Sequence, residues 1–190
     1  MAKLYLCIDT QYDFQEGGNL GVDGGKKCGD LQAEYLSKHK DEYGIVIATV
    51  DWHPITHCSF KDNGGIWPPH CVQHSHGAAI YQPLLDVLTE CHNFVTLTKG
   101  CDEDHEEYSI FKNEESKQKL ISLIKACDID EIHVGGIAYN YCVASTCKDG
   151  LRYLPNVKFK VFKEFCPAIA DGTANEFTEF INHSERIELV

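Results

Sequence analysis

The chain has 190 residues, of which 43% are hydrophobic and 24% charged, and its formal net charge is −12 at pH 7. This length suffices for one domain with a complete hydrophobic core. The excess of acidic residues argues against nucleic acid or an anionic membrane as the partner. No apolar run approaches membrane-spanning length. The absence of a secretory signal predicts a cytoplasmic protein whose ten cysteines are reduced thiols.

The first half of the chain alternates short apolar runs with a helical pattern. The first apolar run ends at Asp9 and the second ends at Asp51. Between residues 52 and 77 the chain is rich in histidine, proline and glycine, and a loop of this length in a compact domain is usually functional. We predict a strand at 4–8, a helix at 30–39 and a strand at 45–50.

The second half continues the alternation, with a strand that ends at Lys99, an acidic loop, and a strand followed by a turn and Cys142. Strands alternating with helices predict crossover connections and a mostly parallel sheet. We therefore expect a single α/β domain over residues 1–190, with a six-stranded sheet flanked by helices in a Rossmann-type three-layer arrangement. The predicted helices are 81–91, 114–126, 141–151 and 174–182, and the predicted strands are 94–98, 131–135, 157–162 and 187–190.

Four polar residues fall at or just past the ends of predicted strands: Asp9, Asp51, Lys99 and Cys142. In parallel sheets ligands bind outside the carboxyl ends of the strands, so these residues predict one site. Cys142 also stands where a helix begins, and the free N–H groups there favour a thiolate and can hold an oxyanion. Taken alone, each residue is better explained as a helix cap, a surface charge or a buried structural thiol, and only their joint placement predicts a site.

A metal site is predicted in the long loop. Asp51 and His53 are two residues apart, and a further histidine, His70, follows Trp-Pro-Pro. One carboxylate and two imidazoles suit zinc, manganese or iron and leave coordination positions open. His57 or Ser59 is a candidate fourth ligand. The alternative interpretation is a histidine-rich surface loop.

Several short motifs occur together in a specific order and spacing. They are Ile8-Asp9-Thr10-Gln11-Tyr12-Asp13-Phe14 with Gly17-Gly18, Asp51-Trp52-His53-Pro54 with His57 and Ser59-Phe60, Trp67-Pro68-Pro69-His70-Cys71-Val72-Gln73, Lys99-Gly100, Tyr108-Ser109, and Gly136-Ile137-Ala138 through Tyr141-Cys142-Val143. In these motifs the chain resembles, over nearly its full length, the nicotinamidases (pyrazinamidases) of the isochorismatase-like cysteine hydrolases.

The resemblance implies roles for particular residues. The catalytic triad would be Asp9, Lys99 and Cys142, and a cis peptide bond would precede Ala138. One divalent metal ion, zinc first and iron or manganese as alternatives, would be bound by Asp51, His53 and His70, with His57 or Ser59 as a possible fourth ligand. The substrate ring would pack near Phe14, Trp67, Tyr108 and Tyr141.

The implied reaction is hydrolysis of nicotinamide to nicotinic acid and ammonia through an acyl-thioester on Cys142, feeding NAD salvage, with pyrazinamide as a further substrate. Asp9 would carry the proton, although reference pKa values of about 8.5 for cysteine and 3.9 for aspartate make that transfer cost roughly 6 kcal/mol. Lys99 and the helix N-terminus would lower the pKa of the thiol, and burial would raise that of the carboxylate. The backbone N–H groups of Ala138 and Cys142 would hold the oxyanion. The metal would bind the ring nitrogen.

Other functions are weighed against this one. A carbamoyl hydrolase or an isochorismate-like vinyl-ether hydrolase of the same superfamily is the nearest, and a non-catalytic metal-binding protein is the alternative from another class. The chain departs from the family pattern at Tyr139-Asn140 and in the acidic stretch 102–107, and both departures can alter the pocket rim. The sequence is compatible with a homo-oligomer.

Overall fold

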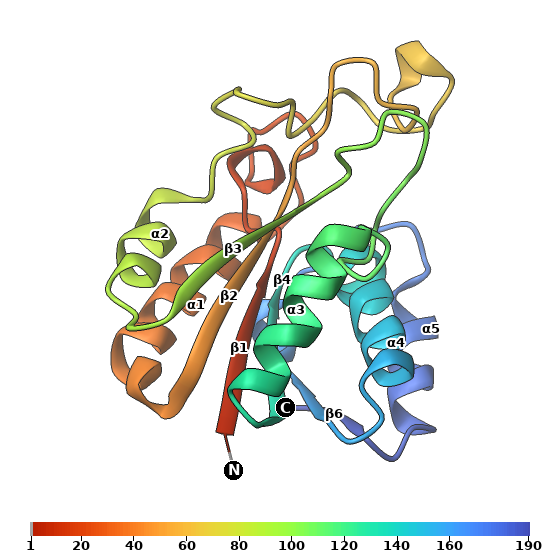
Figure 1. Cartoon of the computed structure of the whole chain (residues 1–190). Coiled ribbons are helices and arrows are strands. Elements are labelled where there is room, and N and C mark those ends of the chain that lie inside the picture. Colours follow the sequence, from red (N-terminus) through yellow and green to blue (C-terminus); the bar gives the residue numbers. More distant parts are fainter. Residues whose placement is uncertain (1) are drawn as a thin grey trace.

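Six parallel strands run through the centre of the molecule in the order β3-β2-β1-β4-β5-β6 (Figure 1). The structure is a computed structural model and describes residues 2–190. The strand order reverses at β1, where β2 and β4 pair with its two edges, and ligand sites of parallel sheets lie at such reversals. The strands are β1 Ala2–Ile8, β2 Tyr43–Asp51, β3 Phe94–Lys99, β4 Ile129–Gly136, β5 Lys158–Val161 and β6 Ile187–Leu189. The predicted parallel α/β fold is confirmed.

Helices cover both faces of the sheet, so its central strand is buried on both sides. Leu4, Leu6 and Ile8 of β1 belong to the core cluster that includes residues of α3, α4 and α5. Tyr5 and Cys7 point the other way, into the cluster formed with α1 and α2. The two sets of helices lie on opposite sides of the sheet in Figure 1. The helices are α1 Gly25–His39, α2 Gln82–Thr89, α3 Glu114–Ala126, α4 Ala144–Tyr153 and α5 Ala174–Asn182.

The helices at 114–126 and 174–182 have the predicted bounds, but α1 begins at Gly25 instead of residue 30. The prediction treated Gly25 as part of a loop because glycine disfavours helices. In the structure it permits a close contact, since a Cβ there would lie 2.3 Å from the Phe14 carbonyl oxygen. Glycine in this helix is therefore a packing residue.

The segment around Cys142 also differs from the prediction. The helix does not start cleanly at residue 141: Tyr139–Val143 forms a π-helical turn that continues into α4. The N–H groups of Tyr141 and Val143 both donate to the Ala138 carbonyl. Turns of this kind are frequent at functional sites.

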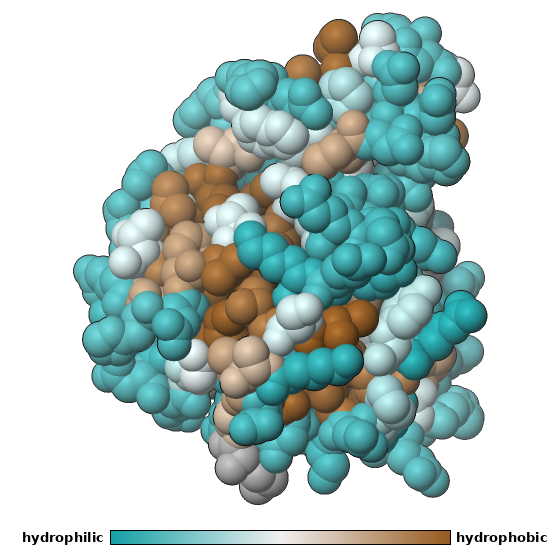
Figure 2. Space-filling view, in the orientation of Figure 1, coloured by the Kyte–Doolittle hydropathy of each residue, from teal (hydrophilic) through white to brown (hydrophobic). Residues whose placement is uncertain are grey.

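None of the ten cysteines forms a disulfide, as predicted. Among residues 2–190, no helix has both the length and the apolar character needed to cross a membrane. On the face shown in Figure 2, hydrophilic residues surround apolar ones, which gather over the edge strand β3 and on the loop after β2. The most exposed large hydrophobic residues of that loop are Ile55 and Ile66.

Candidate active site

Asp9, Lys99 and Cys142, predicted from three different strand ends, lie in contact. The Lys99 ammonium is 2.9 Å from Asp9 Oδ2 and 3.5 Å from Cys142 Sγ. It also pairs with Asp51 Oδ1. Asp9 and Lys99 are completely buried, and Cys142 is 6% exposed. The arrangement places one thiol, one cation and two carboxylates in a space with almost no water access.

Backbone geometry at the sheet edge produces this cluster. Asp51 and Lys99 are register partners on β2 and β3, which places their side chains on the same face. At the end of β1 the chain turns through Asp9, whose φ is +47°. The Thr49 hydroxyl donates to Asp9 Oδ1 at 2.7 Å and so leaves Oδ2 facing Lys99.

At the end of β4 the chain crosses very close to β1. Gly136 has φ +137°, and a Cβ there would lie 2.0 Å from the Ile8 carbonyl oxygen, so only glycine fits. The peptide bond Ile137–Ala138 is cis, as the resemblance predicted. These two features lead the chain from β4 to Cys142.

Burial dominates the electrostatics of the cluster. It raises the pKa of Asp9, against the lowering effect of Lys99, and it raises the pKa of the Cys142 thiol well above its ordinary value. Burial lowers the pKa of Lys99, but the carboxylates of Asp51 and Asp9 outweigh it, so the ammonium is retained. For Asp51, Lys99 and His53 outweigh burial and hold its pKa low. As predicted, Lys99 lowers the pKa of the Cys142 thiol, but burial raises that pKa by more.

Asp51, His53 and His70 bring three potential ligand atoms within 4.8 Å of one another, and all three side chains are buried. His53 Nδ1 bonds the Gly100 carbonyl at 2.9 Å and His70 Nδ1 bonds the Pro68 carbonyl at 2.8 Å. A carbonyl accepts only from an N–H, so Nε2 of each ring carries the free lone pair. Metal-binding histidines are held in this way. The donor set fits a divalent metal such as zinc.

The two candidate fourth ligands are engaged elsewhere. His57 Nδ1 lies 2.7 Å from Ser59 Oγ, and His57 Nε2 lies 3.2 Å from the His105 carbonyl. Burial lowers the pKa of His57 to about 4, which keeps the ring neutral. Among residues 2–190, His57 does not join the group of potential ligand atoms formed by Asp51, His53 and His70. The fourth position stays a prediction.

Substituting Gly100 with alanine is expected to lower zinc affinity about 10–100-fold, because that residue supports His53. Gly100 has φ +66°, and a Cβ there would lie 2.3 Å from His53 Cε1. Gly64→Ala is the matched control, since its φ is +92° and its Cβ would meet nothing within 4 Å. Titration against a competing chelator measures the affinity. Equal zinc affinity in the two variants would contradict the assignment of His53 as a ligand.

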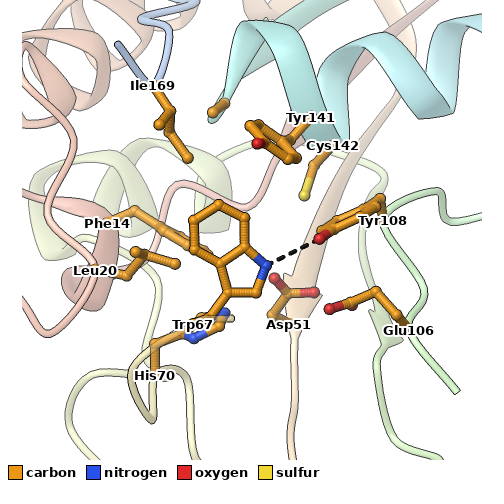
Figure 3. A pocket seen from close by; sticks show the side chains of 11 residues that line it. Phe14, Leu20, Asp51, Trp67, His70, Glu106, Tyr108, Tyr141, Cys142 and Ile169 are labelled. Carbon is orange, nitrogen blue, oxygen red and sulfur yellow. Dashed lines mark hydrogen bonds between the residues drawn. The ribbon is translucent and has the colours of Figure 1, made fainter. Parts of the chain in front are cut away.

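The Cys142 thiol and the Asp51 carboxylate line one small cavity (Figure 3). Its volume is about 20 Å³, enough for about one water molecule. All four predicted ring contacts line it, and the Trp67 indole Nε1 donates to the Tyr108 hydroxyl at 2.9 Å. The lining residues are Phe14, Leu20, Asp51, Trp67, His70, Glu106, Tyr108, Ala138, Tyr141, Cys142 and Ile169. The four aromatic side chains in this wall suit a flat ring.

Sequence reasoning missed the residues that hold this framework. The Gln11 side chain donates to the Asp51 carbonyl and accepts from the Asp51 N–H, both at 2.8 Å. Asp13 Oδ2 accepts from the Cys71 N–H at 2.7 Å, next to a candidate ligand, and Glu107 Oε2 accepts from the Gly100 N–H at 2.6 Å. Both Gln11 and Asp13 stand in the first motif, which was the only signal available.

The fold and the site together define a parallel α/β protein with a buried cysteine, aspartate and lysine beside a group able to bind a metal. The isochorismatase domain family matches residues 3–153, and the chain belongs to this family.

Similar proteins agree in fold and length. The nicotinamidase of Escherichia coli K12 is 32% identical over 184 residues, which cover 88% of this chain and 84% of the relative. The pyrazinamidase of Pyrococcus horikoshii, solved in complex with zinc, has a TM-score of 0.86 at 29% identity, covering 100% of this chain and 99% of that one. PnC1 of L. infantum, solved in complex with nicotinate, has a TM-score of 0.82 at 28% identity, covering 100% and 95%.

Proposed function

We propose that the protein is a nicotinamidase, which hydrolyses nicotinamide to nicotinic acid and ammonia and so supplies NAD salvage. The observation that carries the proposal is the Cys142 thiol, 3.5 Å from the Lys99 ammonium and beneath an aromatic cavity edged by Asp51 and His70. The similarity to a nicotinamidase and to a zinc-containing pyrazinamidase supports it. Pyrazinamide, which differs by one ring nitrogen, is a further proposed substrate.

In the first half of the reaction Cys142 Sγ bonds to the carboxamide carbon and its proton passes to Asp9 Oδ2. The carbonyl oxygen becomes an oxyanion, for which we propose the backbone N–H groups of Ala138 and Cys142 as donors. Asp9 then returns the proton to the amide nitrogen, the C–N bond breaks, and ammonia leaves a thioester on Cys142.

In the second half a water molecule attacks the thioester carbon and gives a proton to Asp9. The C–S bond breaks, nicotinic acid forms, and the proton returns to sulfur. Because burial raises the pKa of both Asp9 and Cys142, it does not remove the mismatch between them. Lys99, which contacts both groups, is the residue that lowers the pKa of the thiol and stabilises the thiolate as it forms.

A divalent metal bound by Asp51, His53 and His70 would supply a Lewis-acidic position for the ring nitrogen and fix the ring orientation. Removing the metal is therefore expected to weaken nicotinamide binding about tenfold or more, the loss of one bond of at least ~1.4 kcal/mol. Benzamide, which has the same shape without the ring nitrogen, should bind with little change. Calorimetry on the Cys142→Ala variant, with and without EDTA treatment, measures both. An equal loss for the two ligands would contradict the ring-anchoring role.

Ammonia release separates the alternative functions. A carbamoyl hydrolase would release ammonia from N-carbamoyl compounds and leave nicotinamide intact. A vinyl-ether hydrolase would act without the Cys142 thiol, and a metal-storage protein would release no ammonia from any amide. We expect the zinc-loaded protein to release ammonia from nicotinamide in preference to carbamoyl compounds. The aromatic lining of the cavity favours this outcome.

A further inference from the structure

One wall of the cavity comes from the connection between β5 and α5. Ile169 lies on this connection and lines the cavity on the same side as Tyr141, across the Trp67 indole from His70 (Figure 3). We call residues 167–173 the wall segment. The wall segment is bonded to the turn that carries Cys142: the Tyr139 N–H donates to the Pro167 carbonyl at 2.8 Å, and the side chains of Asn140 and Tyr141 make the other hydrogen bonds.

Asn140 directs its whole side-chain amide at the wall segment. Its Nδ2 lies 3.0 Å from the Ile169 carbonyl, 3.0 Å from Asp171 Oδ1 and 2.9 Å from Thr173 Oγ1. Its Oδ1 accepts from the Ile169 N–H at 3.0 Å. Both backbone groups of Ile169 are therefore held by one side chain.

Tyr141 makes the second attachment. Its hydroxyl donates to Asp171 Oδ2 at 2.6 Å, and Asp171 Oδ1 accepts from the N–H and hydroxyl of Thr173 at 2.9 and 2.7 Å. The Tyr141 hydrogen bond, followed by those from Thr173, lowers the pKa of Asp171 to about 2, so the carboxylate is ionised near neutral pH. The Tyr141 ring packs edge-on against Trp67 and Tyr108, with centroids 5.2 and 5.4 Å away.

The cavity of about 20 Å³ must widen before a pyridine carboxamide can enter, since that volume accommodates about one water molecule. Cys142, Asp51 and His70 belong to the sheet-edge framework and to the ligand group, so they have little freedom to move apart. Beyond the backbone hydrogen bond of Pro167, the wall segment from Ile169 to Thr173 is attached to this turn through the side chains of Asn140 and Tyr141. The strength of these attachments therefore limits how far this wall of the cavity can move away from the thiol.

We propose that Asn140 and Asp171 are specificity-determining residues that restrict the substrate to carboxamides of one small, unsubstituted aromatic ring. They act as positioning residues, because they hold Ile169 and Tyr141 against the place of the ring and touch no reacting atom. This inference rests on the proposed amidase function and goes beyond it in naming what limits the substrate.

Hydrolysis of two substrates of different size tests the inference. Wild-type protein is expected to favour nicotinamide over 5-methylnicotinamide by roughly tenfold or more in kcat/KM, as for one extra methyl group in a tight pocket. Asp171→Ala should reduce this preference to about threefold or less, mainly by lowering KM for the larger substrate. Asp171→Asn, which keeps the shape of the side chain and one hydrogen-bond acceptor, should retain most of the wild-type preference for nicotinamide. Glu176→Gln, which removes an exposed acid of α5, is the charge-matched control and should leave it unchanged.

Accessibility of the thiol provides a test without turnover. Peptide mass spectrometry can follow alkylation at Cys142 by iodoacetamide and by the bulkier N-phenylmaleimide. Asp171→Ala should raise the N-phenylmaleimide rate relative to the iodoacetamide rate about tenfold, equivalent to ~1.4 kcal/mol. Tyr141→Phe, which removes only the hydroxyl, should shift the ratio in the same direction and serves if the alanine variant does not fold.

The two tests separate the inference from the proposed function. An unchanged size preference and an unchanged alkylation ratio in the variants would overturn the inference even if nicotinamide is hydrolysed. Equal hydrolysis of the two substrates by wild-type protein would also overturn it. If wild-type protein hydrolyses no aromatic amide, the proposed function fails, while the alkylation ratio still decides whether Asp171 limits access to the thiol.

Discussion

Replacing Cys142 with alanine is expected to lower kcat/KM for nicotinamide by about four orders of magnitude or more, because a residue that forms the covalent intermediate has no substitute in the site. Cys142 is the cysteine among the residues that line the cavity. The Lys99 ammonium lies 3.5 Å from its sulfur, and a carboxylate oxygen of Asp9 lies within 4.8 Å of it. Coupled measurement of ammonia release determines the rate. Binding of nicotinic acid should persist in the variant, since the aromatic lining and the residues proposed as metal ligands are unchanged.

Cys147→Ala provides the matched control for this experiment. Cys147 is a completely buried thiol on α4, in the same helical segment as Cys142. Cys147 is not among the residues that line the cavity, so the Cys147→Ala variant should retain nearly full activity. Retained hydrolysis in Cys142→Ala, or an equal loss in the two variants, would contradict the assignment of Cys142 as the nucleophile.

Replacing Lys99 with methionine is expected to lower the free energy of unfolding of the metal-free protein by about 3–5 kcal/mol, the range for removing one partner of a buried ion pair. Lys99 is completely buried between Asp9 and Asp51, so its loss leaves two carboxylates in the interior without a counter-charge. Urea unfolding of EDTA-treated protein measures this change. Amidase activity should be lost as well, because the Lys99 ammonium is the positive charge that contacts the Cys142 thiol.

A second substitution distinguishes the charge effect from a packing effect. Asp9→Asn in the Lys99→Met background removes one of the stranded charges and should recover part of the lost stability, by more than ~1 kcal/mol. Lys117→Met, which removes a cation from an ion pair with the exposed Glu114 side chain, should change stability little. If the double variant is no more stable than Lys99→Met, the charge explanation is wrong.

The parallel sheet could be predicted because its strands are continuous apolar runs between helical patterns. Asp9, Asp51, Lys99 and Cys142 follow from the same signal, since each stands at the end of such a run and parallel strands bring their ends to one edge. His53 and His70 could be predicted from their chemistry and from the motifs. The sequence could not show which ring nitrogen of each histidine is free to bind a metal, because that depends on the hydrogen bonds of the two rings to the carbonyls of Gly100 and Pro68.

Other parts of the site depend on contacts that no periodic pattern records. Gln11 bonds Asp51 across 40 residues, and Asn140 bonds Ile169 across 29. From the sequence alone, polar side chains of this kind are expected at the surface, because their hydrogen-bond partners are distant in the chain and become neighbours only in the folded structure. The early start of α1 has the same origin, because Gly25 is required by contact with Phe14 and not by local helix propensity. Contacts between residues distant in sequence therefore determine these features, which local conformational preference does not specify.

The acyl-thioester on Cys142 is the central claim, and partitioning with hydroxylamine tests it most directly. Zinc-loaded protein is mixed with nicotinamide and increasing hydroxylamine, and both nicotinic acid and nicotinohydroxamic acid are quantified. A covalent intermediate predicts that the two nucleophiles compete for it, so hydroxamate forms at the expense of nicotinic acid, and that Cys142→Ala forms neither. Hydrolysis that yields nicotinic acid alone at every hydroxylamine concentration, or hydroxamate formation that persists in Cys142→Ala, would contradict the account.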